Sequence, residues 1–205
     1  CGLTVVQKTV IQLVLSVFYL LSMHSAGDDT MFVPFVGRIS LGWFYWILGI
    51  CVVYGTVNAV NLTDGTDGLC SSVAITAGIS FMVIAFLRNN AGASLLASVL
   101  VGGCAGFIVW NRNPAKIFMG DTGSLFLGGL VVGLAYKLNC PLMILIAGLW
   151  YVIEALSVVL QVISFKLFKK RIFKKLTDFL LKIFIVRIPV VLKKTFNKER
   201  HQHIG

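Results

Sequence analysis

The sequence predicts an all-α fold, a polytopic bundle of transmembrane helices with about six spans in this chain. Of the 205 residues, 58% are hydrophobic and 13% are charged, and the mean hydropathy is +0.90. Such a chain is too apolar for an ordinary soluble domain. Several windows of about 18 residues carry almost no charge, and that length crosses a bilayer as a helix. We find no series of short alternating strands of the kind that a transmembrane barrel needs.

Apolar runs and polar interruptions place the expected spans in order along the chain. We expect them at residues 5–23, 41–60, 69–87, 92–110, 124–138 and 140–165. A further stretch at 176–192 is interrupted by charges and a proline, so an amphipathic surface helix is an equal alternative to a seventh span. We therefore expect a transmembrane body over residues 1–165 and a basic tail over 166–205, amphipathic or aberrant.

Basic residues indicate how the bundle is oriented. Twelve of the 18 Lys and Arg lie between Lys166 and Arg200. By the positive-inside rule, the tail and the loops at 61–68 and 111–122 are cytoplasmic. The segment 24–39, which includes Asp28 and Asp29, is then expected as a solvated outer loop. A basic cluster that follows an apolar span is typical of a flank near anionic lipid, so we expect a membrane partner and no nucleic acid.

The first polar motif, NAVNLTDGTDGL at residues 58–69, lies where one expected span ends and the next begins. Carboxylates beside the hydrocarbon are costly unless they are paired, hydrated or bound to a metal. The glycines permit a positive φ and a close approach of the backbone to a ligand. A tight turn with Asp67 capping the next helix is the alternative. Such a turn does not need six polar or flexible residues, so the motif favours a site.

The second polar motif, NRNPAKIFMGDTGS at residues 111–124, also lies at a cytoplasmic junction. An acidic residue in a Gly-flanked turn, here Asp121, can hold Mg²⁺, and free N–H groups at a helix start suit phosphate oxygens. Phe118 could stack on a base, and Lys116 could lie near phosphate charge. The alternative is that Asp121 or Thr122 caps the next helix and Phe118 packs in the core. Together the motifs suit a nucleotide diphosphate and a metal that serve a lipid acceptor.

The two motifs resemble the signature loops of the polyprenyl-phosphate sugar-1-phosphate transferases. Residues 2–8 and 154–173 resemble two further helices of that family, so the resemblance covers about residues 2–174. It implies a Mg²⁺-dependent enzyme that crosses the bacterial inner membrane several times and has its active site on the cytoplasmic face. A homodimer is one assembly that the resemblance allows. The implied reaction transfers phospho-MurNAc-pentapeptide from UDP-MurNAc-pentapeptide to undecaprenyl phosphate, which gives lipid I and UMP in peptidoglycan synthesis.

The resemblance also implies roles for single residues. It makes Asp121 the Mg²⁺ ligand, Asp121 and Asp64 the catalytic residues, and Phe118 the stacking partner of uracil. The substrate-binding residues that we expect are Asn58, Asn61, Asp64, Asp67, Asn111, Lys116, Phe118, Gly120, Ser124 and Gln161.

Two features of the family pattern do not appear in this chain. One is an adjacent Asp pair followed by a Lys, upstream of residue 2, and the other is a loop with three consecutive histidines after residue 174. We therefore expect a truncated or frame-altered chain with little or no transferase activity alone. Three alternatives stay open: the sister transferase that moves GlcNAc-1-phosphate to the same lipid, a membrane transporter with an ion site at mid-membrane, and an inactive remnant that keeps the fold.

Overall fold

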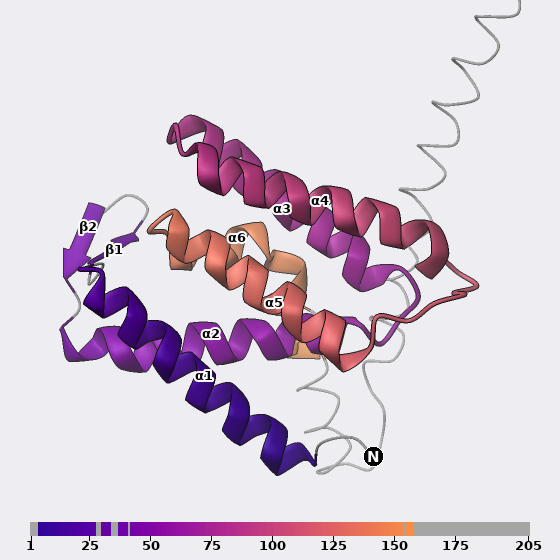
Figure 1. Ribbon diagram of the computed structural model, residues 1–205, viewed down its shortest axis with the longest axis horizontal. Helices are drawn as coiled ribbons and strands as arrows, with labels where there is room; N and C mark the ends of the chain where they lie inside the picture. Colours follow the sequence, from indigo (N-terminus) through magenta and orange to yellow (C-terminus); the bar gives the residue numbers. More distant parts are fainter. Residues whose placement is uncertain (1–3, 28–29, 34–36, 41, 154, 158–205) are drawn as a thin grey trace, which may run out of the picture.

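A computed structural model describes residues 4–27, 30–33, 37–40, 42–153 and 155–157. Figure 1 shows a bundle of helices with one short hairpin, so the expected helical bundle is confirmed. The elements are α1 (Val5–Ser25), β1 (Thr30–Val33), β2 (Gly37–Ser40), α2 (Trp43–Thr63), α3 (Leu69–Leu87), α4 (Ala91–Asn111), α5 (Gly120–Lys137), the 3₁₀ helix η1 (Pro141–Met143) and α6 (Ile144–Ala147).

Four helices of the described residues are long and apolar enough to cross a membrane. They are Val6–Ser25, Trp43–Thr63, Leu69–Leu87 and Ala91–Asn111, and they coincide with the first four expected spans. The expected total of about six is not confirmed. Helix α5 has 18 residues and carries charged residues in its terminal turns, and α6 has only four residues. The end of the expected span 140–165, the stretch 176–192 and the basic tail lie outside the described residues.

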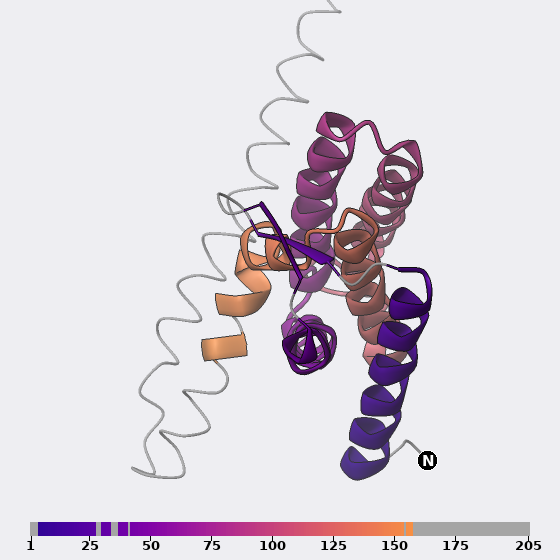
Figure 2. The same ribbon diagram turned by 90° about the vertical axis from the view of Figure 1, so that its left-hand side faces the viewer.

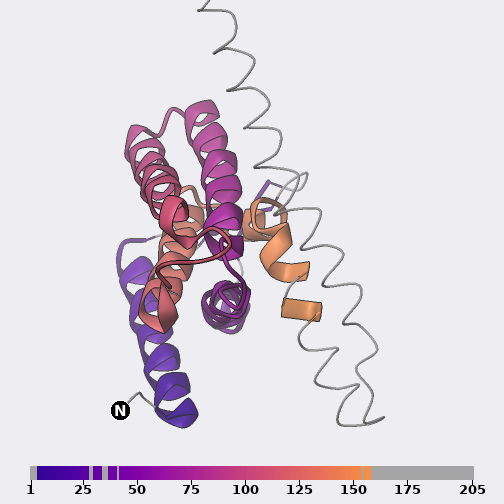
Figure 3. The ribbon, with the colours of Figure 1, turned by 90° about the vertical axis from the view of Figure 1, so that its right-hand side faces the viewer.

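The helices pack as neighbouring pairs, with α3 against α4, α2 against α5, and α1 against α2. Figure 1 shows that α1, α3 and α5 begin at the end of the bundle where α2 and α4 finish. We call this the motif end, because the loops 64–68 and 112–119 lie there. Viewed along α2, helices α1 and α5 lie on one side of it and α6 on the other (Figure 2 and Figure 3). Two of the helices that meet at the motif end, α1 and α5, are therefore neighbours of α2.

Small residues let the helices approach closely. Five alanines of α3 and α4, the pair in closest association, have no exposed surface: Ala74, Ala77, Ala85, Ala93 and Ala97. At the α2–α5 contact, a Cβ added to Gly128 would lie 2.8 Å from the Cα of Val57. Lipid tails are as apolar as leucine, so helices in a membrane associate largely through such close packing. A side chain at position 128 would therefore push α2 and α5 apart.

The segment 24–39, which we expected as a solvated outer loop, contains most of a short hairpin that the sequence did not predict. Strand β1 pairs antiparallel with β2, with Thr30 opposite Ser40 and Val33 opposite Gly37. Strands of four residues lie at the lower limit of length at which an alternating pattern indicates a strand. Asp28 and Asp29 lie outside the described residues. The hairpin lies at the end of the bundle opposite the motif end (Figure 1).

Candidate functional site

Polar side chains from α1, α2 and α5 meet at the motif end. The Nζ atom of Lys8 donates to Oδ1 of Asn61 at 2.9 Å and to Oδ2 of Asp121 at 3.1 Å. The Nδ2 atom of Asn61 donates to Oδ1 of Asp121 at 3.0 Å and to Oγ of Ser124 at 2.8 Å. We call these four residues, with the neighbouring Asp64, the polar cluster. The structure thus brings together residues of both polar motifs.

Local backbone structure explains how the cluster forms. Helix α2 ends at Thr63, so Asn61 lies in its last turn and Asp64 is its C-cap. Gly120, the first residue of α5, has a φ of +66°. Residues that carry a Cβ rarely adopt this conformation, whereas glycine adopts it readily. Asp121 follows in the first helical turn, where the helix dipole favours a negative charge. The hydroxyl of Ser124 donates to the Gly120 carbonyl at 3.0 Å. This bond orients the Ser124 oxygen so that it can accept from Asn61.

The two carboxylates of the cluster are in different electrostatic environments. Hydrogen bonds from Asn61 and Lys8 lower the pKa of Asp121, whose side chain is 72% exposed. Burial raises the pKa of Asp64, the negative charge of Asp121 raises it further, and the backbone N–H of Gly120 opposes both effects. Neighbouring carboxylates whose pKa values move apart can take different roles. Asp121 is the carboxylate held in its charged form.

The cluster offers the kind of ligands that Mg²⁺ prefers. This ion takes oxygen ligands, and proteins commonly hold it with one or two carboxylates while water and phosphate complete its shell. No group of three or more His, Cys, Asp or Glu suited to a metal occurs in the described part of the chain. The cluster nevertheless already holds a cation, because the Lys8 ammonium lies between oxygens of Asn61 and Asp121. The residues therefore fit a metal ion that shares its coordination with a substrate.

Two of the predicted substrate-binding residues join the loops of the motif end to each other. Oδ1 of Asn111 accepts from the Gly68 N–H at 3.0 Å, and its Nδ2 donates to the Ile117 carbonyl at 2.9 Å. Oδ2 of Asp67 accepts from the Ala115 N–H at 3.0 Å. These side chains hold the loop 64–68 against the loop 112–119. Their contact with a substrate stays a prediction.

The other predicted residues are distributed around the cluster. Phe118 is 70% exposed, so it does not pack in the core, and it remains available for stacking. The ammonium of Lys116 lies 5.5 Å from the ring centroid of Trp110. Nδ2 of Asn58 donates to the Tyr54 carbonyl and to Gln12, both at 2.8 Å. Gln161 lies outside the described residues.

Lys8 is the cluster residue that our site prediction did not include. The signal was present, because a charged residue inside an otherwise apolar helix is expensive and is usually functional. Lys8 lies in the first turns of α1, 53 positions before Asn61 and 113 before Asp121. The sequence does not show which of the distant polar residues such a lysine approaches.

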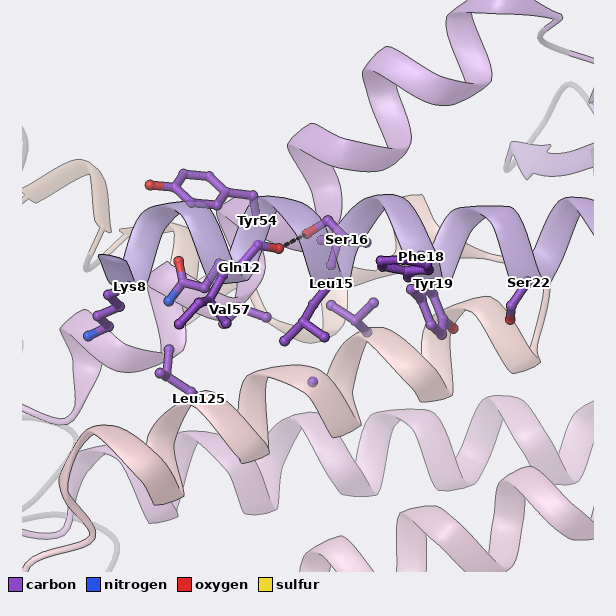
Figure 4. A pocket seen from close by; sticks show the side chains of 14 residues that line it. Lys8, Gln12, Leu15, Ser16, Phe18, Tyr19, Ser22, Tyr54, Val57 and Leu125 are labelled. Atoms are coloured by element: carbon purple, nitrogen blue, oxygen red, sulfur yellow. Dashed lines mark hydrogen bonds between the residues drawn. The ribbon is translucent and has the colours of Figure 1, made fainter. Parts of the chain in front are cut away.

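An apolar groove begins at the polar cluster and follows α1 between α2 and α5 (Figure 4). Its volume is about 560 Å³. Lys8 and Gln12 line one part of it, and apolar side chains line most of the rest: Ile11, Leu15, Phe18, Val53, Val57, Leu125 and Val132. This shape suits an amphiphile whose charged head lies at the cluster and whose apolar chain lies along the helices.

Comparison with known proteins shows the family. The profile described as "Glycosyl transferase family 4" matches residues 1–139, which include the whole polar cluster. This chain belongs to glycosyl transferase family 4. It is similar to the phospho-N-acetylmuramoyl-pentapeptide-transferases of Bacillus thuringiensis (strain Al Hakam) and Bacillus cereus (strains AH187 and G9842), at 45% identity over 175 residues in each case. The match covers 84% of this chain and 54% of each relative, so the chain spans about half the length of the curated relatives it matches.

The family resemblance inferred from the two motifs is therefore confirmed. With its apolar helices, this member of glycosyl transferase family 4 is a multi-pass membrane protein. The roles of single residues are not tested by these similarities.

In this family 4 chain, substitution of Asn111 with Ala should destabilise the motif end. The side chain is 3% exposed, and its loss leaves the Gly68 N–H and the Ile117 carbonyl without their partner. An unpaired buried polar group costs about 1–3 kcal/mol, so the unfolding temperature should fall by several degrees. Thermal unfolding in detergent measures this effect, with Asn113→Ala in the same loop as the matched control. Equal unfolding temperatures of the two variants would contradict the structural role of Asn111.

Proposed function

We propose that the protein transfers phospho-MurNAc-pentapeptide from UDP-MurNAc-pentapeptide to undecaprenyl phosphate, which yields lipid I and UMP, at the cytoplasmic face of the bacterial inner membrane. The observation that carries this proposal is the position of the polar cluster at the head of an apolar groove. A reaction between a water-soluble nucleotide sugar and a lipid phosphate needs a polar site for the phosphates beside an apolar surface for the lipid chain. The names of the similar Bacillus proteins support the choice of substrates.

The residues of the cluster have separate tasks in this reaction. Asp121 would hold Mg²⁺, which when bound neutralises phosphate charge. An ammonium group has three N–H donors, and Lys8 uses two of them on Asn61 and Asp121, so the third can reach a phosphate of the acceptor. Asn61 orients both Lys8 and Asp121, and Ser124 fixes Asn61. The raised pKa of Asp64 suits it to hold a proton close to the reacting phosphates.

The exposed loop 112–119 would bind the nucleotide. Phe118 presents an open ring two residues before Gly120, where a uracil could stack on it. Stacking of a base on an aromatic side chain contributes about 1–3 kcal/mol. Lys116 adds positive charge on the same loop, where the pyrophosphate of the nucleotide sugar would approach.

The proposal is tested by offering the enzyme two donors. The full gene product, purified in detergent with Mg²⁺ and undecaprenyl phosphate, should release UMP and form a lipid-linked product from UDP-MurNAc-pentapeptide. UDP-GlcNAc should give neither. Product from UDP-GlcNAc alone would identify the sister transferase instead, and ion flux in vesicles without nucleotide binding would identify a transporter. The 205-residue chain assayed alone tests the expectation that it has little activity.

A further inference from the structure

Two amide side chains face each other inside the bundle, one helical turn from the polar cluster. Nδ2 of Asn58 donates to the Tyr54 carbonyl and to Oε1 of Gln12, both at 2.8 Å. A backbone carbonyl can only accept a hydrogen bond, so Asn58 must present its nitrogen on this side. Gln12 must then present its oxygen to Asn58. The direction of the Gln12 amide is therefore determined by the bonds around it.

This arrangement leaves the nitrogen of Gln12 without a partner. Its Nε2 atom is buried and forms no hydrogen bond with any residue that the structure describes. An unpaired N–H group is unfavourable in apolar surroundings, so an acceptor that enters the site would be stabilised. Gln12 lines the apolar groove, as Lys8 does one turn earlier on the same face of α1. Figure 4 shows Lys8, Gln12 and Leu15 following one another along the groove.

We propose that Gln12 binds the phosphate of the lipid acceptor through Nε2, beside the Lys8 ammonium, and that Asn58 is a positioning residue that acts through Gln12. This inference rests on the proposed function. Beyond Gln12 the groove is mostly apolar, so a phosphate held there belongs to a molecule with a long apolar chain. Asn58, which we predicted to bind the substrate, would then do so indirectly.

Steady-state kinetics of Gln12→Met test the proposal, because methionine keeps the length of the side chain and removes its N–H donors. A hydrogen bond to a charged group is among the strong ones, so the KM for undecaprenyl phosphate should rise by about 10-fold or more. The KM for the nucleotide sugar and kcat should change by less than about 2-fold. Asn58→Leu should likewise raise the KM for undecaprenyl phosphate and leave the KM for the nucleotide sugar nearly unchanged. The rise should be smaller, because this variant keeps the Gln12 amide and removes only the bond that orients it.

Ser16→Ala is the matched control, one turn further along α1. The Ser16 hydroxyl donates to the Gln12 carbonyl at 2.7 Å, so this donor is used within the helix. Both KM values of this variant should equal those of the unmodified enzyme. A rise of both KM values in Gln12→Met would indicate a general packing defect and would overturn the proposal.

Binding measurements separate the phosphate from the apolar chain and need no turnover. Farnesyl phosphate, farnesol and UMP are each titrated into the unmodified protein and Gln12→Met in detergent. Only farnesyl phosphate should bind more weakly to the variant, by about 10-fold or more. Equal binding of farnesyl phosphate to both proteins, or displacement of it by millimolar inorganic phosphate, would overturn the assignment to a lipid phosphate. Failure of the unmodified protein to bind either farnesyl phosphate or UMP would instead refute the proposed function and this inference with it.

Discussion

Replacement of Asp121 with Asn should lower kcat by about 10³-fold or more, because the side chain loses its charge where phosphate charge must be balanced. The new amide would also face two donors, since Asn61 and Lys8 both donate to the carboxylate of Asp121. The effect is measured as UMP release by the full gene product at saturating concentrations of both substrates.

The neighbouring Thr122 gives a matched control for this experiment. Thr122 is exposed in the same first turn of α5, and no hydrogen bond of its side chain connects it with the polar cluster. Thr122→Val should therefore keep nearly full activity. Residual activity of Asp121→Asn above about a tenth of the unmodified enzyme would mean that Asp121 is not central to the reaction.

Substitution of Gly128 with Ala should impair both stability and activity, although no atom of Gly128 belongs to the polar cluster. The added Cβ would lie 2.8 Å from the Cα of Val57, so α5 and α2 must separate. Overpacking of this kind costs about 1–3 kcal/mol, which exceeds the gain of about 1 kcal/mol from the higher helix propensity of alanine. Separation of α2 from α5 also stretches the contacts of Asn61 with Asp121 and Ser124. A misplacement of about 1 Å in a catalytic site can lower the rate by about 10²-fold.

Gly133→Ala is the matched control in the same helix. A Cβ at Gly133 meets no atom within 4 Å, so this variant should be as stable as the unmodified protein or slightly more stable, with unchanged activity. Thermal unfolding and UMP release are measured for both glycine variants. If the two behave alike, close packing of α5 on α2 does not control the geometry of the site.

The helices could be predicted from the sequence where polar residues interrupt the apolar runs. Helix α3 begins and ends at the expected residues because glycine precedes it and Arg88 follows it. The proximity of the two motifs was also predictable. Two spans separate their loops, so the chain crosses the membrane and returns, and both loops lie on the same side. The described part of the last expected span contains a break that the sequence did not predict, since α6 ends at Ala147 and helical structure resumes at residue 149.

The candidate site was predictable in its residue types and less so in its contacts. Asn61, Asp121 and Ser124 come together as the motifs indicated. Asn111 appeared equally suited to bind a ligand, yet its amide connects two loops, because an amide serves a backbone group as well as a substrate. Lys8 was not included because its partners lie far away along the chain, and only the packing of α1 on α2 reveals them.

The bond between Lys8 and Asp121 links two binding events thermodynamically. A cation that binds Asp121 competes with the ammonium of Lys8. The observed affinity for the cation is therefore lower than it would be if Asp121 were free of this contact. The ammonium that is released becomes a free counter-charge for an anion in the groove. In the proposed reaction, each ligand would therefore increase the affinity for the other by the same factor, through one shared side chain.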